Sequence, residues 1–408
     1  MTIGQDDGLV FLAEIMNRQI LVLDAAQRSA LAVTRSLGKL PRLDVFTAEA
    51  ASMALAGSSR YSEGFFTSPS AIDAPQDYIT WLEQLTASID FALVIPVTEV
   101  TSQLLLMNMA RLPKVRLAFS SYENVLQLAD KGKLMALAQR LDIAIPATQF
   151  LASTAELPAA NLAFPFVIKP CLSKIFTPDG WIATTVKIIH NQADLDKVLG
   201  SEAYLHNYPF MIQEFIPGHG AGVFCLYDRG KPVTFFAHRR LREKPPQGGI
   251  SVLSESAIAE PKLKLTAEKL LAAADWHGVA MVEFRIAPDG TAYLMEVNTR
   301  FWGSLQLAID SGVDFPALMV SNQLGLGLTS PNSYKIGQRL RWLLGDVDSL
   351  YLYLKANYSL TAKAGRIIAF LTPHLFSTKH EIDRFNDLKP ALFELKTYVR
   401  QLLGKSPL

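Results

Sequence analysis

Two glutamates, Glu283 and Glu296, stand on either side of an Asp289-Gly290 pair, thirteen positions apart. Asp-Gly favours a two-residue type I′ turn between antiparallel strands, and this turn would place Glu283 directly opposite Glu296. Opposed residues share a face with β-carbons roughly 5 Å apart, where like charges repel. Both glutamates have apolar neighbours, which argues against a hairpin that simply faces water. A hard cation between the carboxylates would remove the repulsion, so the spacing predicts a metal site.

The strand that carries Glu296 continues with Asn298 and Arg300, which lie on the same face because strand side chains alternate. An amide oxygen beside two carboxylates suits Mg²⁺, which proteins usually hold by one or two carboxylates together with substrate phosphates. A slip of one residue in the hairpin would separate the carboxylates and remove the site. We therefore predict Glu283, Glu296 and Asn298 as metal ligands.

Phosphates in turn need cations, and two lysines are candidates. Lys169 lies inside the apolar run 164–170, where an ammonium group is costly unless it meets an anion. It could also extend to water from the end of that strand. Lys133 lies in a helical stretch, where a lone lysine usually faces solvent. Neither lysine identifies a phosphate site by itself.

Hydrophobic periodicity predicts the elements that would position these residues. Short apolar runs alternate with helical stretches in the first 120 residues, which is typical of a parallel α/β domain. A Gly-x-Gly-x-x-Gly turn is absent there, so a dinucleotide-binding domain is not supported. The runs are residues 19–24, 43–48 and 91–96, and the helical stretches are 29–37, 77–88 and 102–111.

Beyond residue 120 the pattern changes to α+β with mainly antiparallel strands, and after residue 330 it becomes mainly helical. A long helix is expected over 122–141, a strand over 164–170 with an antiparallel partner over 181–189, and a flexible break over 218–222. Further strands are expected at 210–216, 223–227 and 233–238, and further helices at 193–199, 266–275, 338–344, 347–356 and 390–403.

Three separate segments together resemble the ATP-grasp superfamily, which includes biotin carboxylase, carbamoyl-phosphate synthetase and many carboxylate–amine ligases. They read ADKGKLMALAQRLDIAIPAT, FPFVIKP and VEFRIAPDGTAYLMEVNTRFWGS. In the third, MEVNTR matches the Glu-x-Asn-x-Arg pattern of the superfamily. The resemblance implies that Glu283, Glu296 and Asn298 hold Mg²⁺ or Mn²⁺, and that Arg300 contacts substrate or an acyl phosphate.

The same resemblance implies the groups that bind ATP. Lys169 matches the second phosphate lysine of the superfamily, and Lys133 matches the first, with Lys131 as the competing register. The segment MIQEFIPG is similar to the hinge that receives adenine and ribose. Its candidate contacts are Gln213, Glu214, Phe215 and Ile216.

A segment rich in arginine, AHRRLREKPPQGGIS, is expected to form a mobile loop that closes over anions. Arg239 and Arg242 could each hold a phosphate or carboxylate through two hydrogen bonds, and we predict both as catalytic residues. An exposed basic loop is the alternative explanation. His238, beside these arginines, is a weaker candidate for a general base.

One segment departs from the superfamily pattern. A glycine-rich loop usually covers the phosphates, whereas residues 171–183 contain only Gly180. Ser173, Lys174 and Thr177 could replace the missing backbone donors. Whether this loop grips phosphate is left open by the sequence.

The composition excludes several classes of function. The 408 residues carry 39 basic and 38 acidic side chains, so the chain as a whole is not expected to seek nucleic acid. Residues 331–408 are locally basic, with 12 Lys or Arg against 6 Asp or Glu. A solvated helical face explains such a region most often, and association with a membrane surface is the second explanation.

Cysteine usage and the N-terminus predict a cytoplasmic protein. Cys171 and Cys225 are the two cysteines, which cannot make a disulfide framework and fit a reducing compartment. The N-terminus is acidic before any apolar run, which is wrong for a signal peptide. No stretch reaches 18 apolar residues, so no membrane span is expected.

The resemblance therefore implies an ADP-forming, ATP-dependent ligase that activates a small carboxylic acid as an acylphosphate and joins it to an amine. We expect a pre-ATP-grasp α/β domain over 1–120 and an ATP-grasp domain over 121–330. The latter divides into a lysine-bearing part (121–208) and a metal-binding part (209–330), followed by a helical region (331–408). A carboxylase, a small-molecule kinase and a non-catalytic nucleotide-binding module are the alternatives. Oligomeric state and substrates are not predicted.

Overall fold

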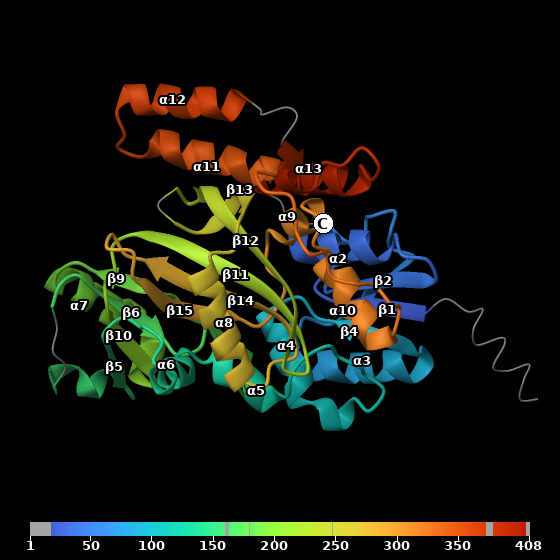
Figure 1. The fold of residues 1–408 in the computed structure, drawn as a ribbon, viewed down its shortest axis with the longest axis horizontal. Coiled ribbons are helices and arrows are strands. Elements are labelled where there is room, and N and C mark those ends of the chain that lie inside the picture. Colours follow the sequence, from blue (N-terminus) through green and yellow to red (C-terminus); the bar gives the residue numbers. More distant parts are fainter. Residues whose placement is uncertain (1–17, 160–162, 179, 247, 373–377, 405–408) are drawn as a thin grey trace, which may run out of the picture.

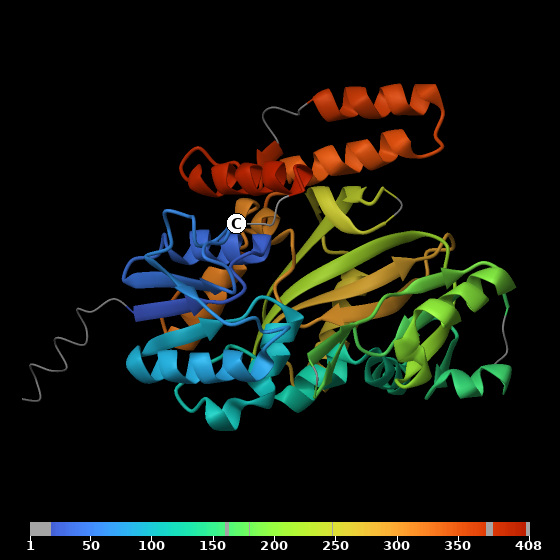
Figure 2. The same ribbon diagram turned by 180° about the vertical axis from the view of Figure 1, so that it is seen from behind.

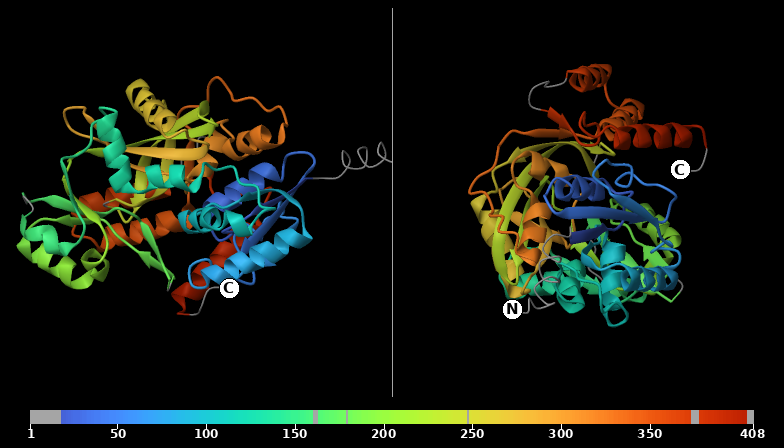
Figure 3. Two further views of the ribbon diagram at one scale, coloured as in Figure 1. Left: turned by 90° about the horizontal axis from the view of Figure 1, so that it is seen from below. Right: turned by 90° about the vertical axis from the view of Figure 1, so that its right-hand side faces the viewer.

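The protein folds around three main β-sheets with a layer of helices along one side (Figure 1). We describe it from a computed structural model, which covers residues 18–159, 163–178, 180–246, 248–372 and 378–404. The N-terminal residues, for which the sequence predicts no signal peptide, lie outside these ranges. Figure 3 shows the N-terminal unit and the four-stranded antiparallel sheet of residues 148–214 at opposite ends of the molecule, with the seven-stranded sheet between them.

The N-terminal unit is a parallel sheet in the strand order β3-β2-β1-β4, which confirms the predicted α/β class. Its central strand β1 is fully buried over its last three residues, as expected for a strand covered on both faces. The helix predicted at 102–111 begins earlier, at Glu99, because Thr98 caps it by accepting a hydrogen bond from the Thr101 amide. The elements are β1 (Arg18–Val22), α2 (Arg28–Leu37), β2 (Leu43–Glu49), β3 (Gly64–Thr67), α3 (Pro75–Ser88), β4 (Phe91–Ile95) and α4 (Glu99–Met107).

The second sheet is antiparallel, in the order β5-β10-β6-β9. The single partner strand predicted at 181–189 is divided in two. Its first half, β8, pairs with β7 in a separate hairpin, and only β9 pairs with β6. The elements are β5 (Thr148–Leu151), β6 (Phe166–Pro170), β7 (Lys174–Thr177), β8 (Gly180–Ala183), β9 (Lys187–Ile189), α7 (Gln192–Ser201) and β10 (Phe210–Glu214).

The third sheet has the order β15-β14-β11-β12-β13-β16-β17, and its neighbours are antiparallel except for β16 and β17. Its strands are β11 (His219–Asp228), β12 (Lys231–Lys244), β13 (Ile250–Ala257), β14 (Gly278–Ile286), β15 (Ala292–Asn298), β16 (Arg339–Arg341) and β17 (Thr378–His380). This sheet supplies the metal-site candidates.

Three local predictions fail in this sheet because partner strands override local sequence preference. The flexible break at 218–222 is instead largely strand β11, which has a hydrogen-bonded neighbour on each side. The arginine-rich segment is not a mobile loop, since most of it lies in β12 and the start of β13. The helix predicted at 338–344 is wrong at its start, where β16 pairs with β13.

Helices complete the fold on both sides of the third sheet. A core shared by the N-terminal unit and residues 301–320 joins α2 to α9 (Leu305–Asp310) and α10 (Phe315–Leu324). On another side lie α5 (Tyr122–Ala129), α6 (Lys131–Arg140) and α8 (Pro261–Ala273). The C-terminal helices α11 (Leu343–Lys355), α12 (Leu360–Leu371) and α13 (Lys389–Leu402) form the outer layer (Figures 1 and 2). None of the described helices has the length and apolar composition needed to cross a membrane.

Candidate active site

The β14–β15 hairpin places Glu283 directly opposite Glu296, as the sequence predicts, but by a different route. The predicted two-residue type I′ turn is wrong. The Gly290 amide donates to the Ala287 carbonyl and the Ala287 amide to the Thr291 carbonyl, which makes a three-residue loop. Gly290 has φ of +86°, the left-handed conformation that closes a loop of this kind. This loop shifts the register by one residue, and a bulge at Met295 shifts it back before Glu296.

Asn298 and Arg300 lie beside the two glutamates, also as predicted. The Asn298 amide nitrogen donates to Glu283 Oε1 at 3.0 Å and lies 3.4 Å from Glu296 Oε1. Arg300 donates to Asn298 Oδ1 at 3.3 Å and to the Phe301 carbonyl at 2.9 Å. The hairpin therefore gathers two carboxylates, one amide and one guanidinium at a single place.

The two carboxylates differ in charge environment. Burial and the neighbouring Glu296 charge raise the pKa of Glu283, although Arg240 opposes this shift. Burial also acts to raise the pKa of Glu296, but Lys131 and Lys169 outweigh it and lower that pKa. Glu296 is therefore the more firmly ionised member of a pair in which each carboxylate disfavours the charge of the other.

Lys169 on β6 reaches this cluster from the second sheet. It is 4% exposed, and its ammonium group donates to the Met295 carbonyl at 2.8 Å. Met295 is the extra residue of the bulge, so the irregularity that restores the hairpin register also receives the lysine. Burial lowers the pKa of Lys169 to about 8, against the opposing effect of the Glu296 charge. An ammonium group this strongly desolvated favours the approach of an anion.

The lysine of α6 that lines the pocket is Lys131, not Lys133. The predicted helix 122–141 is broken at Asp130, whose carboxylate caps α6 by accepting from the Gly132 and Lys133 amides. The break turns Lys131 inward, where its ammonium donates to Ser173 Oγ at 2.9 Å and lies 3.8 Å from Glu296 Oε2. Lys133 is exposed, and we withdraw it as a site residue.

A pocket opens onto these groups and adds a carboxylate that the sequence does not single out. Glu99, at the start of α4, faces the pocket from the N-terminal unit. Burial raises its pKa, while Lys131 and Arg300 oppose that shift. Asp24 fixes the start of this helix by accepting from the Val97 and Thr98 amides, both at 2.9 Å. The pocket is lined by Glu99, Ala129, Lys131, Ser173, Glu296, Val297, Asn298, Thr299 and Arg300.

The arginine of β12 that reaches the site is Arg240, not Arg239 or Arg242. Arg240 donates to Glu283 Oε2 at 2.9 Å and pairs with Glu243 at 3.3 Å. Arg239 extends outward and pairs with Glu255 at 2.6 Å. Arg242 pairs with the buried Asp346 of α11 at 2.5 Å, so it serves the C-terminal layer. Both predicted catalytic arginines are therefore corrected, because an irregular register in β12 decides which side chain points to the site.

The predicted nucleotide hinge connects the second sheet to the third. Gln213 is 1% exposed and donates to Thr148 Oγ1 at 3.0 Å, while its side-chain oxygen has no hydrogen-bond partner among the described residues. Glu214 ends β10 with an exposed side chain, and Phe215 is half-buried. Ile216 is buried, and its carbonyl accepts from Arg285 at 3.2 Å.

The glycine-poor segment forms the β7–β8 hairpin. Ser173, before β7, holds Lys131, whereas Lys174 and Thr177 lie in β7 itself. Thr177 donates to the Gly180 carbonyl at 2.9 Å, so its hydroxyl is already used within the hairpin. Trp181 on β8 packs against the core of the N-terminal unit. The hairpin therefore spans the two domains beside the pocket.

The two cysteines and His238 are unsuited to act as a nucleophile or a base. Burial raises the pKa of Cys171 to about 11, and it also raises that of the fully buried Cys225. Burial lowers the pKa of His238 to about 3, and the ring is stacked on Phe224 with centroids 4.7 Å apart. His238 is therefore a neutral core residue.

Known proteins resemble this chain in part of its sequence and in its fold. Residues 206–345 match a family described as "ATP-grasp in the biosynthetic pathway with Ter operon". That match covers the β14–β15 hairpin, the hinge and β12. No curated protein sequence matches the chain significantly.

Several solved structures share the fold at low sequence identity. An L-amino acid ligase from Bacillus licheniformis is 17% identical, with 76% of this chain and 74% of that chain covered and a TM-score of 0.58. Biotin carboxylase from Campylobacter jejuni, solved with βγ-ATP, is 16% identical (80% and 75% covered, TM-score 0.61). N5-carboxyaminoimidazole synthetase from Staphylococcus aureus, complexed with ADP, is 15% identical (79% and 81% covered, TM-score 0.58). At these identities the likeness establishes the fold, while the chemistry has to be argued from the residues.

Proposed function

We propose that this chain is an ATP-grasp enzyme, an ATP-dependent ligase that joins a carboxylic acid to an amine. The observation that carries the proposal is the convergence of Lys131, Lys169, Glu296, Asn298 and Arg300. These side chains come from three separate segments of the chain. All but Lys169 line one pocket, and Lys169 reaches the Met295 carbonyl beside it. Groups of both charge signs that come from distant segments and face a pocket are suited to a charged ligand.

The donor set at the hairpin fits a hard divalent cation. Glu283 and Glu296 supply oxygen atoms of the type that Mg²⁺ and Mn²⁺ prefer, and Asn298 would add a third through Oδ1, which here accepts from Arg300. Within the described ranges no group of three or more His, Cys, Asp or Glu side chains is placed to hold a metal. Two carboxylates and an amide would leave coordination positions for phosphate and water, as is usual for Mg²⁺. When bound, the cation would neutralise charge on the β- and γ-phosphates of ATP.

The lysines and the hinge would hold the rest of the nucleotide. Lys131 and Lys169 present buried ammonium groups beside Glu296, where they would bind phosphate oxygens. The unpartnered oxygen of Gln213 is a hydrogen-bond acceptor at the edge of the hinge, suited to the amino group of adenine. Glu214, at the exposed end of β10, is placed to meet the ribose.

The proposed reaction needs no nucleophilic side chain. An oxygen of the substrate carboxylate attacks the γ-phosphorus, the bond to the β,γ-bridging oxygen breaks, and ADP leaves. The amine then attacks the carbonyl carbon of the acylphosphate, inorganic phosphate leaves, and the nitrogen loses a proton. Arg300 and the two lysines stabilise the charge that develops on the transferring group. The closed N-terminal side of the pocket would limit access of water to the acylphosphate.

Glu99 is the observation that favours an amine as the acceptor. Its carboxylate lines the same pocket as Arg300 but comes from the opposite domain. A buried carboxylate there would attract an ammonium group and could accept its proton before attack.

The test is ADP release by the purified protein with Mg-ATP and panels of acids and amines. We expect release to depend on both an acid and an amine, and to be lost in Glu296→Gln. Release that needs an acid alone, or bicarbonate, would indicate a kinase or a carboxylase. ATP binding without turnover across all panels would indicate a nucleotide-binding module. Glu99→Gln should raise the KM for the amine far more than the KM for ATP.

A further inference from the structure

The outer helix α13 presents a regular apolar stripe to solvent. Leu388, Leu392, Leu395, Val399 and Leu402 follow one another at spacings of four and three residues, and their exposed fractions lie between 45% and 71%. This spacing places them along one face of the helix. A monomeric soluble protein rarely leaves such a continuous apolar face uncovered.

The rotation of α13 about its axis is fixed by contacts on the opposite side. Phe393 packs against the main core, and Glu394 accepts from the Trp342 indole nitrogen at 2.6 Å. The Tyr398 hydroxyl donates to Asp348 Oδ1 at 2.6 Å. These contacts hold the polar and aromatic side inward, so the leucine stripe faces away from the molecule.

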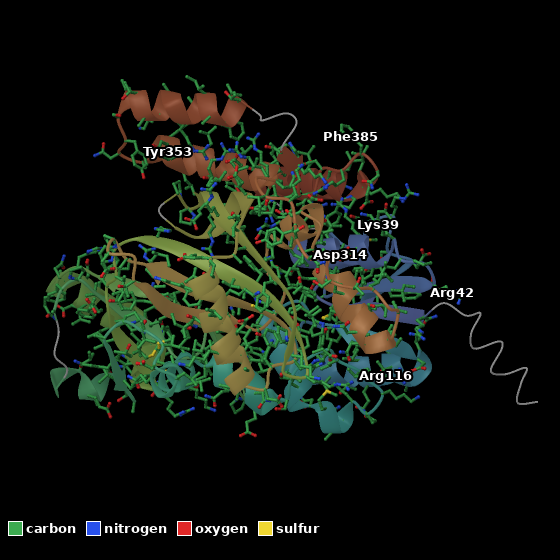
Figure 4. The ribbon with its side chains drawn as sticks, viewed as in Figure 1. Lys39, Arg42, Arg116, Asp314, Tyr353 and Phe385 are labelled. Atoms are coloured by element: carbon green, nitrogen blue, oxygen red, sulfur yellow. The ribbon has the colours of Figure 1, made fainter. Side chains whose placement is uncertain are left out.

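Other elements of the outer layer also expose apolar side chains. None of the residues of α12 is buried, and Leu360, Ile368 and Leu371 are 85%, 65% and 68% exposed. Phe385, in the connection that precedes α13, is 99% exposed and lies at the outer edge of the layer (Figure 4). Figures 1 and 2 show α12 and α13 along the same side of the molecule, away from the second sheet (β5-β10-β6-β9).

The acidic side chains of this C-terminal region all have partners, whereas two lysines beside the stripe are exposed. Residues 331–408 hold 12 basic and 6 acidic side chains, and each of the six acids is engaged by a partner. Those pairs are Asp346 with Arg341, Asp348 with Lys244, Glu381 with Arg28, Asp383 with His380, Asp387 with Arg35, and Glu394 with Trp342. Lys389 and Lys396 are exposed and lie on one flank of the stripe.

We propose that the outer face of α12 and α13 docks on an anionic phospholipid surface. A helix with leucines on one face and lysines at its flank lies in the plane of the membrane interface, with the apolar face in contact with the acyl boundary. The lysine stems can follow the apolar face while their ammonium groups reach anionic headgroups. Each acid of this region has a partner within the protein, which reduces the repulsion that such a surface would otherwise meet.

A second copy of this chain fits the face less well. Antiparallel pairing of two stripes would set the flank with Lys389 and Lys396 against the same flank of the other copy. In parallel pairing these lysines would meet Ala391 and Tyr398, which offer no negative charge. Both arrangements leave the lysines without an anionic partner, whereas anionic headgroups supply one.

The proposal is tested by flotation of the full chain with phosphatidylcholine vesicles that contain or lack phosphatidylglycerol. We expect binding to the anionic vesicles alone, weakened in about 1 M salt, where the Debye length falls to about 3 Å. Leu395→Ser combined with Val399→Ser should lower the partition coefficient roughly tenfold or more. Lys389→Glu combined with Lys396→Glu should have a similar effect.

Matched controls lie on α8 and at the start of β12. Leu265→Ser removes a leucine that is 64% exposed outside the layer, and Lys231→Glu with Lys262→Glu reverses two exposed lysines there. We expect these variants to bind like the wild type. The proposal is overturned if anionic vesicles bind no better than neutral ones, or if control and test variants lose binding equally. It is also overturned if sedimentation shows a dimer that the Leu395→Ser, Val399→Ser variant dissociates.

Discussion

Two clusters of charge in this protein are built from the same kinds of side chain but differ in access. At the candidate site, Glu283 and Glu296 have side chains that are 22% and 33% exposed, and a pocket opens beside them. In the C-terminal layer, Asp346 is fully buried and accepts from Arg242, Arg341 and Arg366. The open cluster can take up a ligand, whereas the sealed one can only hold elements together.

Strand β12 contributes one arginine to each cluster. Arg240 pairs with Glu283, and Arg242, two positions along the same strand, pairs with Asp346. The register between β12 and β13 is irregular at this point, which separates the directions of the two side chains. Neighbouring arginines in a sequence are therefore no evidence of a shared function.

The largest effect on the open cluster is expected from Glu296→Gln. Loss of this charge removes a metal ligand and the partner of Lys131, so Mg²⁺-dependent ADP release should fall about 1000-fold or more. The free energy of unfolding should also fall, because the folded protein loses a charge that Lys131 and Lys169 stabilise, so activity is compared per folded molecule. Asp289→Asn at the tip of the same hairpin is the control and should keep full activity. An active Glu296→Gln variant would remove the hairpin from the mechanism.

The matching change in the sealed cluster is Asp346→Asn, which should act on stability. Three buried guanidinium groups would lose their shared anion, and we expect the free energy of unfolding to fall by about 3–5 kcal/mol. Denaturant titration measures this value. Activity per folded molecule should stay near that of the wild type, and a selective loss of activity would contradict the distinction between the clusters.

The two lysines of α6 test which residues belong to the open cluster. Lys131→Ala should weaken ATP binding and turnover by roughly 100-fold, because the ammonium group lies against Glu296 in the pocket. Lys133→Ala, two residues away and exposed, should leave both unchanged. Equal losses in the two variants would show that the break at Asp130 does not decide which lysine acts.

Arg240→Gln and Arg242→Gln should separate activity from stability along one strand. The first should lower kcat by roughly tenfold through the lost charge beside Glu283, with little change in Tm. The second should lower the free energy of unfolding by about 1–3 kcal/mol, because it removes a partly buried charged hydrogen bond to Asp346. Paired assays of kcat and Tm test this contrast, and reversed outcomes would refute it.

The smallest effect concerns pH and the C-terminal layer. Burial raises the pKa of Glu394 to about 7, above its ordinary value of about 4.3. The folded protein therefore binds this proton more tightly, and stability falls as the pH rises from about 4 to about 7. Glu394→Gln should abolish this part of the pH dependence of Tm. An identical dependence in variant and wild type would assign it to other groups.

The sequence predicts what depends on nearest neighbours along the chain. The parallel α/β unit and the facing of Glu283 and Glu296 follow from periodicity and from the Asp289-Gly290 turn, even though the turn type differs. The three-residue loop and the bulge at Met295 shift the register in opposite directions. Glu283 therefore still faces Glu296, although the predicted turn type is wrong. No local sequence pattern predicts that bulge.

Residues that depend on distant packing are predicted less well. Lys131 replaces Lys133 because Asp130 interrupts a helical pattern that is otherwise continuous. Glu99 enters the pocket only because the N-terminal unit packs against the third sheet, which one sequence cannot show. A polar residue at a predicted helix start, such as Asp130 ahead of Lys131 or Thr98 ahead of Glu99, is the signal that could have found both.

The most direct test of the central claim is capture of the acylphosphate by hydroxylamine. The wild-type protein would be incubated with Mg-ATP, hydroxylamine and pools of carboxylic acids, and ADP and acyl hydroxamate would be measured together. We predict equal amounts of the two products with at least one pool, and neither product in Glu296→Gln. ADP release without hydroxamate in every pool, or equal product from Glu296→Gln, would contradict the account.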